Sequence, residues 1–282
     1  MKKTFFFWVQ LGVTLLSCLF LIVPVFYVAA IALTKNAFQG IKSGLTLEWL
    51  QKVLSLYGDT IGRGLLIALG TLLVCSAAGI PAAYFLVKSG KPVTSGKGDG
   101  IWKKIQSFLV PALEEALVLP LTVPGLSIGL GILLTWGGLD WFRKSSLFIM
   151  CGHSVFCLPF MVRSVTAVLR TTPLSLYEEA AATLGAGFFR RFFQIVAPVA
   201  APGILAGALQ VLTLSLGEFN VTWMLQTPFT RTLPVGLADS YASMRLEIGS
   251  AYTLIFLVLI VPLLILAQKI PAIFAKIMAG KA

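Results

Sequence analysis

Acidic side chains are scarce in this chain, and three of the five in its apolar second half lie at two places. Only 11 of the 282 residues are Asp or Glu, and there is one His. Glu178 and Glu179 lie in a polar segment, residues 171–203, and Glu218 lies inside an apolar run. The first pair is suited to contact with another protein, and the isolated acid to contact with a solute.

Glu218 is the sharpest single candidate. A carboxylate inside a membrane span is unfavourable unless it is paired or hydrated, so such acids are functional candidates by default. Glu218 is predicted to line a translocation path, with Asn220 and Thr222 as further polar groups of that wall. The alternative is a structural contact with Arg163 or with a polar residue of a neighbouring helix.

The polar segment has readable local structure. Thr172 is predicted to cap a helix whose first turn holds Pro173, because proline lacks the N–H that would be unpaired there. Gly185 and Gly187 are predicted to end that helix, since glycine accepts a left-handed backbone. A second short helix follows, and the segment is expected to close at two prolines. The residues of this second part are Phe188, Phe189, Arg190, Arg191, Phe192, Phe193, Pro198 and Pro202.

The spacing of this segment resembles the EAA loop of ATP-binding-cassette importer permeases. The match is carried by Glu179-Ala180-Ala181, Gly185, Ile195 and Pro198, with Ala197 where the family usually has leucine. In that family the loop forms coupling helices that sit in a groove of a cytoplasmic ATPase. The resemblance therefore implies ATPase coupling for Glu178, Glu179, Ala180, Ala181, Gly185, Arg190, Ile195 and Pro198. An ordinary amphipathic loop helix between two membrane spans is the alternative.

Composition identifies the elements that must position these residues. The chain is 57% apolar and 12% charged, with a mean hydropathy of +0.92, whereas a soluble domain is about 25% charged. Apolar runs of about 20 residues are long enough to cross the hydrocarbon core. We predict an all-α polytopic membrane protein, and the resemblance implies the type I importer (MetI-like) fold. About six transmembrane helices are expected, at residues 1–34, 60–88, 108–136, 147–169, 204–225 and 251–267.

The domain organisation follows from these spans. Residues 1–59 are predicted to form a first span and a short amphipathic helix at the outer face. Residues 60–270 would be the transmembrane domain, and residues 271–282 a cytoplasmic tail. The polar segment 226–249 is expected to be an outer loop. In the second span, Gly62, Gly64, Gly70 and Gly79 are candidates for close helix approach.

Orientation follows from the basic residues. With the N-terminus inside, most of the 22 Lys and Arg residues fall on cytoplasmic loops, including the lysine-rich residues 89–100. The prediction is a multi-pass protein of a bacterial inner membrane, with both termini in the cytoplasm. The net charge of +11 then indicates contact with anionic lipid and not with nucleic acid.

Two prolines interrupt the third span. Pro120 and Pro124 lie in Leu119-Pro120-Leu121-Thr122-Val123-Pro124-Gly125, which resembles a proline-broken helix of the same family. A break of this kind is tolerated where the helix is buried in protein or lines a cavity. Both prolines are therefore candidates for the pathway, and a purely structural kink is the alternative.

The substrate stays open at this stage. Gly217-Glu218-Phe219 resembles the branch of the family that carries polyamines, iron(III), phosphonates or thiamine. An acid in the path favours a cationic solute. Whether two copies of the chain or two paralogues form the pore is also open.

Catalysis by this chain itself is not expected. It has no Gly-x-x-x-x-Gly-Lys-Ser/Thr sequence, so ATP and Mg²⁺ would be bound by a partner. The single His153 cannot make a metal site and is predicted to pack or to hydrogen-bond between helices. The resemblance implies an ATPase dimer, a second permease subunit and an extracytoplasmic binding protein that delivers a small molecule. The alternatives are an ATP-independent carrier or channel and a membrane-embedded enzyme.

Overall fold

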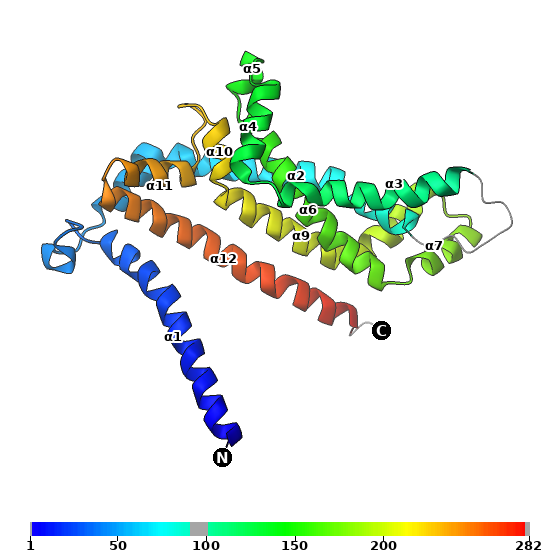
Figure 1. The fold of residues 1–282 in the computed structure, drawn as a ribbon, viewed down its shortest axis with the longest axis horizontal. Helices are drawn as coiled ribbons and strands as arrows, with labels where there is room; N and C mark the ends of the chain where they lie inside the picture. The colour runs from blue at the N-terminus through cyan, green and yellow to red at the C-terminus, as the bar shows by residue number, and fades with distance from the viewer. Residues whose placement is uncertain (1, 91–100, 280–282) are drawn as a thin grey trace. The chain divides into compact units, whose positions relative to one another are not determined.

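The computed structural model describes residues 2–90 and 101–279, and most of these residues are helical (Figure 1). Outside the helices, Thr34 and Leu45 form an isolated antiparallel bridge. The chain divides into two compact units, and the boundary falls within two long helices, α2 (Glu48–Ser89) and α12 (Leu246–Ala279). The predicted division at residues 59 and 270 stays a prediction.

The first unit comprises Met1–Ile61 and Leu233–Leu259. Besides the first turns of α2 and α12 it contains α1 (Lys2–Ile31), η1 (Gly40–Ser43) and α11 (Leu233–Ala242). Its core includes Val53 and Tyr252. The apolar side chains of α1 are largely exposed, as expected for a helix that faces lipid.

The second unit comprises Gly62–Thr232 and Ile260–Ala282. Besides parts of α2 and α12 it contains α3 (Ile101–Val118), η2 (Leu119–Leu121), α4 (Gly125–Trp136), α5 (Asp140–Arg143), α6 (Ser146–Thr171), α7 (Leu174–Thr183), α8 (Phe188–Arg191), η3 (Phe192–Val196), α9 (Ala197–Gly217) and α10 (Asn220–Leu225). Its core joins α2, α6 and α9, and α10 packs against both α4 and α6 (Figure 1).

The number of spans agrees with the sequence. Five helices in the described part are long and apolar enough to cross a membrane. A sixth span is formed if Ile105–Leu121 and Gly125–Trp136 count as one, although they are bent by 104°. The bend lies at the predicted prolines, and Pro124 precedes the first residue of α4. The predicted helix break at the prolines is therefore confirmed, and the assignment of the two helices to one span stays a prediction.

Several boundaries differ from the prediction. Residues 48–59 form no separate short helix, because they are the first turns of the continuous α2. The outer segment 226–249 contains the helix α11, and α12 continues past residue 267 to Ala279. The lysine-rich loop lies largely at residues 91–100, outside the described residues.

Small residues set the closest helix contact of the second unit, between α6 and α9. A Cβ added to Gly203 would lie 2.6 Å from the carbonyl oxygen of Ser164 and 3.1 Å from Cα of Val165. At Gly207 it would lie 3.2 Å from Cα of Met161. The two backbones can approach this closely only because glycine has no side chain.

Of the predicted glycines, two of four lie at contacts. A Cβ on Gly79 would meet Met161, and one on Gly70 would meet Met150. No atom of the described residues lies within 4 Å of a Cβ added to Gly62 or Gly64, so neither glycine makes a close helix contact within this part of the chain.

Candidate functional site

The polar segment after α6 begins differently from the prediction. Pro173, and not Thr172, occupies the position before the first residue of α7. The Thr172 hydroxyl donates to the carbonyl oxygen of Val168 at 3.0 Å, so it closes α6 instead of opening α7. The predicted Thr172 cap is wrong, because the hydroxyl reaches a free carbonyl of the preceding helix end.

Of the two glycines predicted to end α7, Gly185 does so, whereas Gly187 has φ of −68° and precedes the first residue of α8. Gly185 has φ of 80°, the left-handed conformation that glycine accepts without strain. The N–H of Ala186 donates to the carbonyl oxygen of Ala181 at 3.0 Å, which satisfies one of the last carbonyls of the helix.

The second part of the segment does not close at its prolines. α8 runs through the π-helical turn η3 directly into α9, so that Phe188–Gly217 is one continuous span. Pro198 lies at the start of α9, and Pro202 lies inside that helix. The continuous helix therefore accommodates both prolines, Pro198 directly after the π-helical turn and Pro202 in the interior of α9, without ending at either.

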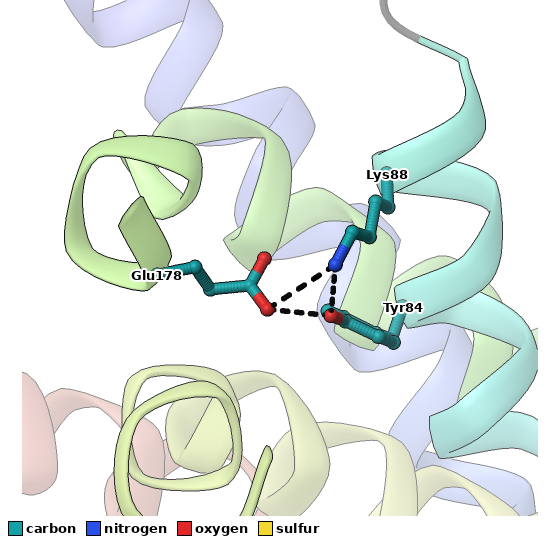
Figure 2. Close-up of polar contacts among 3 residues, drawn as sticks. All are labelled: Tyr84, Lys88 and Glu178. Atoms are coloured by element: carbon teal, nitrogen blue, oxygen red, sulfur yellow. Dashed lines mark hydrogen bonds and ion pairs between the residues drawn. The ribbon is translucent and has the colours of Figure 1, made fainter. Parts of the chain in front are cut away.

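Glu178 anchors α7 to the end of α2 (Figure 2). It is 6% exposed, and its Oε1 accepts a hydrogen bond from the Tyr84 hydroxyl at 2.5 Å. The Lys88 ammonium donates to the Tyr84 hydroxyl at 2.8 Å and lies 3.5 Å from the same Glu178 oxygen. Three polar side chains from two helices thus form one closed contact.

Aromatic rings complete this anchor. The centroid of the Tyr84 ring lies 5.5 Å from that of Phe192 and 6.3 Å from that of Phe188. The Lys88 ammonium lies 5.2 Å from the centroid of the Tyr84 ring, within the range of a cation–π contact. Tyr84 therefore touches both halves of the polar segment.

The other residues of the motif face outward. Glu179, Ala180, Gly185, Arg190 and Pro198 are exposed, and Ala181 and Ile195 are half-buried. Glu178 is thus the one acid of the pair that is held inside the chain, while its neighbour is free on the surface.

Large apolar side chains are exposed beside these residues. Leu184 is 88% exposed, Phe189 74%, Phe193 66% and Leu176 62%. We call these four residues the apolar patch of the segment. Exposed apolar area of this kind is covered either by another protein or by lipid, and Phe189 and Phe193 belong to the continuous span that begins at Phe188.

Glu218 joins a different, buried network at the junction of α9 and α10. Its Oε2 accepts hydrogen bonds from the backbone N–H of Val221 at 2.8 Å and of Thr222 at 3.2 Å. These are free donors at the start of α10, so the carboxylate caps that helix. Arg163 makes no contact with Glu218.

His153 extends this network to α6. Its Nδ1 lies 2.8 Å from the Ser215 hydroxyl and its Nε2 2.7 Å from that of Thr222. Thr222 is fully buried and also donates to the carbonyl oxygen of Glu218 at 3.1 Å. The predicted helix-to-helix hydrogen bond of His153 is confirmed.

The remaining pathway candidates lie around this network. Asn220 and Pro124 are exposed and Pro120 is half-buried. A Cβ added to Gly125 would lie 3.1 Å from Cβ of Asn220 and 3.3 Å from Oε1 of Glu218, so the bend in the third span approaches the junction. The pathway role of these residues stays a prediction. Within the described ranges, no three His, Cys, Asp or Glu side chains are grouped as a metal site.

Removing the Glu218 carboxylate tests the capping contact. We expect Glu218→Ala to lower the free energy of unfolding by about 1–2 kcal/mol, because two buried N–H groups lose their acceptor. The measurement is thermal unfolding of the purified chain. Glu115→Ala is the control, since Glu115 is exposed on α3. An equal loss of stability in both variants would contradict a cap at Glu218.

Comparison with known proteins identifies the family. Residues 103–272 match the family model described as the binding-protein-dependent transport system inner membrane component, which covers more than half of the chain. The chain belongs to this family of importer permeases. The match includes the whole polar segment and Glu218.

Curated relatives agree with this assignment. The molybdenum transport system permease protein ModB of Escherichia coli (strain K12) is 31% identical over 184 residues, which cover 60% of this chain and 80% of that protein. The putrescine transport system permease protein PotI of the same strain is 27% identical over 253 residues, covering 87% and 85% of the two chains. A putative 2-aminoethylphosphonate transport system permease protein, PhnV of Salmonella typhimurium, is 26% identical over 159 residues, covering 56% and 60%.

The fold agrees as well. A chain of the inward-facing MetNI methionine ABC transporter superposes with a TM-score of 0.59 at 14% identity, covering 79% of this permease and 98% of that chain. At this identity the likeness shows the fold alone. The predicted all-α MetI-like architecture is confirmed.

The family establishes the general role. The permease is a multi-pass inner-membrane protein and the permease subunit of an ATP-binding-cassette importer. It is a transport subunit and not an enzyme, and the ATPase belongs to a separate subunit. The carrier, channel and enzyme alternatives are therefore set aside.

Sequence reasoning missed Tyr84 and Lys88. The run Gly79-Ile80-Pro81-Ala82-Ala83-Tyr84 resembles the end of the first shared span of the family, but it gave Tyr84 no role. One signal was present: Tyr84 and Lys88 are four residues apart at the end of an apolar run, which puts two polar groups on one helix face.

Proposed function

We propose that the apolar patch and the exposed face of α7 dock on a cytoplasmic ATPase, and that Glu178 passes the resulting movement to α2. The observation that supports this proposal is the different environment of two adjacent acidic residues. Glu178 is bonded to Tyr84 within the permease, and Glu179 is exposed beside the patch. A helix held on one side and open on the other can transmit force between two proteins.

The wider assembly follows from the family role. A second permease subunit completes the pore, an extracytoplasmic binding protein delivers a small solute, and ATP with Mg²⁺ is bound by a dimer of ATPases. The docking segment and both termini lie in the cytoplasm in this arrangement, since the basic residues favour that orientation. The names of the relatives, molybdenum, putrescine and 2-aminoethylphosphonate transport, refer to solutes of different charge and leave the substrate open.

Charge placed in the apolar patch tests the docking. We expect Leu184→Asp and Phe189→Asp each to reduce copurification of the partner ATPase by about tenfold or more. A desolvated charge without a partner in an interface costs several kcal/mol, and each 1.4 kcal/mol is tenfold in affinity. The measurement is the ATPase-to-permease ratio after affinity purification.

The matched control is Phe229→Asp. Phe229 is 81% exposed but lies between α10 and α11, outside the docking segment. ATPase recovery should equal that of the wild type. Unchanged recovery in both patch variants would overturn the proposed docking surface.

A further inference from the structure

We propose that a cavity between α3 and α6 holds an anionic solute, and that Arg163 is the group that binds its charge. The cavity has a volume of about 310 Å³, and its wall includes Leu86, Glu114, Pro159, Arg163, Thr166 and Arg170. The inference rests on the proposed function, because it assigns a charge class to the solute that the permease passes.

The charges of the cavity do not cancel. Arg170 donates to Oε2 of Glu114 at 2.8 Å, and these two groups neutralise each other. Arg163 is exposed and has no hydrogen bond or ion pair within the described part of the chain. Among the residues that the structure describes, the charged members of the wall are Glu114, Arg163 and Arg170, so one positive charge is left over.

A hydroxyl lies on the same helix face as this charge. Thr166 is three residues after Arg163 on α6, lines the cavity, and is 6% exposed. Its hydroxyl has no hydrogen-bond partner among the described residues. A guanidinium offers a planar fork of N–H donors to an oxyanion. The Thr166 oxygen is itself buried, so its side chain would have to rotate before it could donate to a solute in the cavity.

The acids that would favour a cation are occupied or lie elsewhere. Glu218, the predicted cation contact, gives its carboxylate to two backbone N–H groups of α10 and is not in this wall. Glu114 is bound by Arg170. Glu115 lines a neighbouring cavity of about 460 Å³, together with Glu114, and not the one that holds Arg163.

The test measures the charge preference of the cavity directly. Ala167, which lines the cavity, is replaced by Cys in the full chain in lipid nanodiscs. Its modification by an anionic and by a cationic methanethiosulfonate reagent is then followed by peptide mass spectrometry. The quantity compared is the ratio of the two modification rates, anionic over cationic. The same ratio at Ser243→Cys, an exposed position of the first unit, serves as the reference.

We expect the anionic reagent to be favoured at position 167 relative to the reference. Arg163→Ala should reduce this preference about fivefold or more, because a nearby charge has opposite effects on the two reagents. Arg163→Lys should retain most of it. Lys269→Glu, a charge change at an exposed residue outside the cavity, should leave it unchanged.

Protection identifies the solute class. At constant ionic strength, molybdate and phosphate should slow modification at position 167 when Arg163 is present and not in Arg163→Ala. Putrescine should not. A ratio that does not depend on Arg163, no protection by either oxyanion, or protection by putrescine would each overturn the proposal.

This assay separates the two proposals, since it needs no ATPase. Arg163-dependent protection together with unchanged ATPase recovery in both patch variants would contradict the docking surface alone. Reduced ATPase recovery in the patch variants without that protection would contradict the anionic site alone.

Discussion

Uptake is expected to fall about tenfold or more in Glu178→Ala, although the Glu178 side chain is buried within the permease. The Tyr84 hydroxyl loses its acceptor at 2.5 Å, and a hydrogen bond to a charged group contributes about 1.5–3 kcal/mol. Lys88 is half-exposed, so its ion pair adds little more than about 1 kcal/mol. Loss of the hydrogen bond alone therefore changes the equilibrium constant between the bound and the released form of α7 by about one to two powers of ten, in favour of release.

Two measurements check this expectation. ATP-dependent uptake is followed in proteoliposomes that contain the whole transporter. Amide hydrogen exchange of residues 174–183 is followed in the permease alone, where it reports local release of α7. Tyr84→Phe should increase exchange in the same region, since it removes only the donor.

Glu179→Ala is the matched control, because it deletes the same group one residue away on the exposed side of α7. It should leave hydrogen exchange of the isolated permease unchanged and act only when the ATPase is present. If amide hydrogen exchange of residues 174–183 were the same in Glu178→Ala and Glu179→Ala, Glu178 would not hold α7 against α2.

A second large effect is expected at the contact between α6 and α9. Gly203→Ala places a methyl group 2.6 Å from the carbonyl oxygen of Ser164, a backbone atom that cannot rotate away. Forcing extra volume into a packed contact costs about 1–3 kcal/mol, and here the helices must separate. We expect a marked loss of monodisperse protein in detergent and a lower unfolding temperature.

Gly131→Ala is the control for helix propensity. Gly131 lies inside α4 with nothing within 4 Å of an added Cβ, so alanine there should be neutral or stabilising by up to about 1 kcal/mol. Equal yield and unfolding temperature of Gly203→Ala and the wild type would show that the two helices do not meet at this residue.

Features that depend on neighbouring residues could be predicted from the sequence. The membrane spans follow from apolar runs, the break at Pro124 from proline geometry, and the end of α7 from Gly185. Each is decided by the backbone within a few positions. The EAA spacing was readable for the same reason.

Features that depend on residues far away in the chain could not be predicted from the sequence. Glu178 and Glu179 differ by about 100° around the helix axis, and which of them is buried depends on where α2 lies. Tyr84 is 94 residues away in the chain from Glu178. The capping role of Glu218 likewise depends on a new helix that starts only two residues later, where the sequence indicated one continuous span.

Because Phe192–Val196 forms a π-helical turn, the orientation of α8 relative to α9 depends on the number of residues in that turn. A π turn accommodates one more residue than an α turn, and such bulges often occur at functional sites. Deleting one residue there would restore a regular helix and swing everything before it by about 100° around the axis. The rings of Phe188 and Phe192 would then leave Tyr84, so insertions and deletions in these five positions are constrained even where hydrophobic substitutions are tolerated.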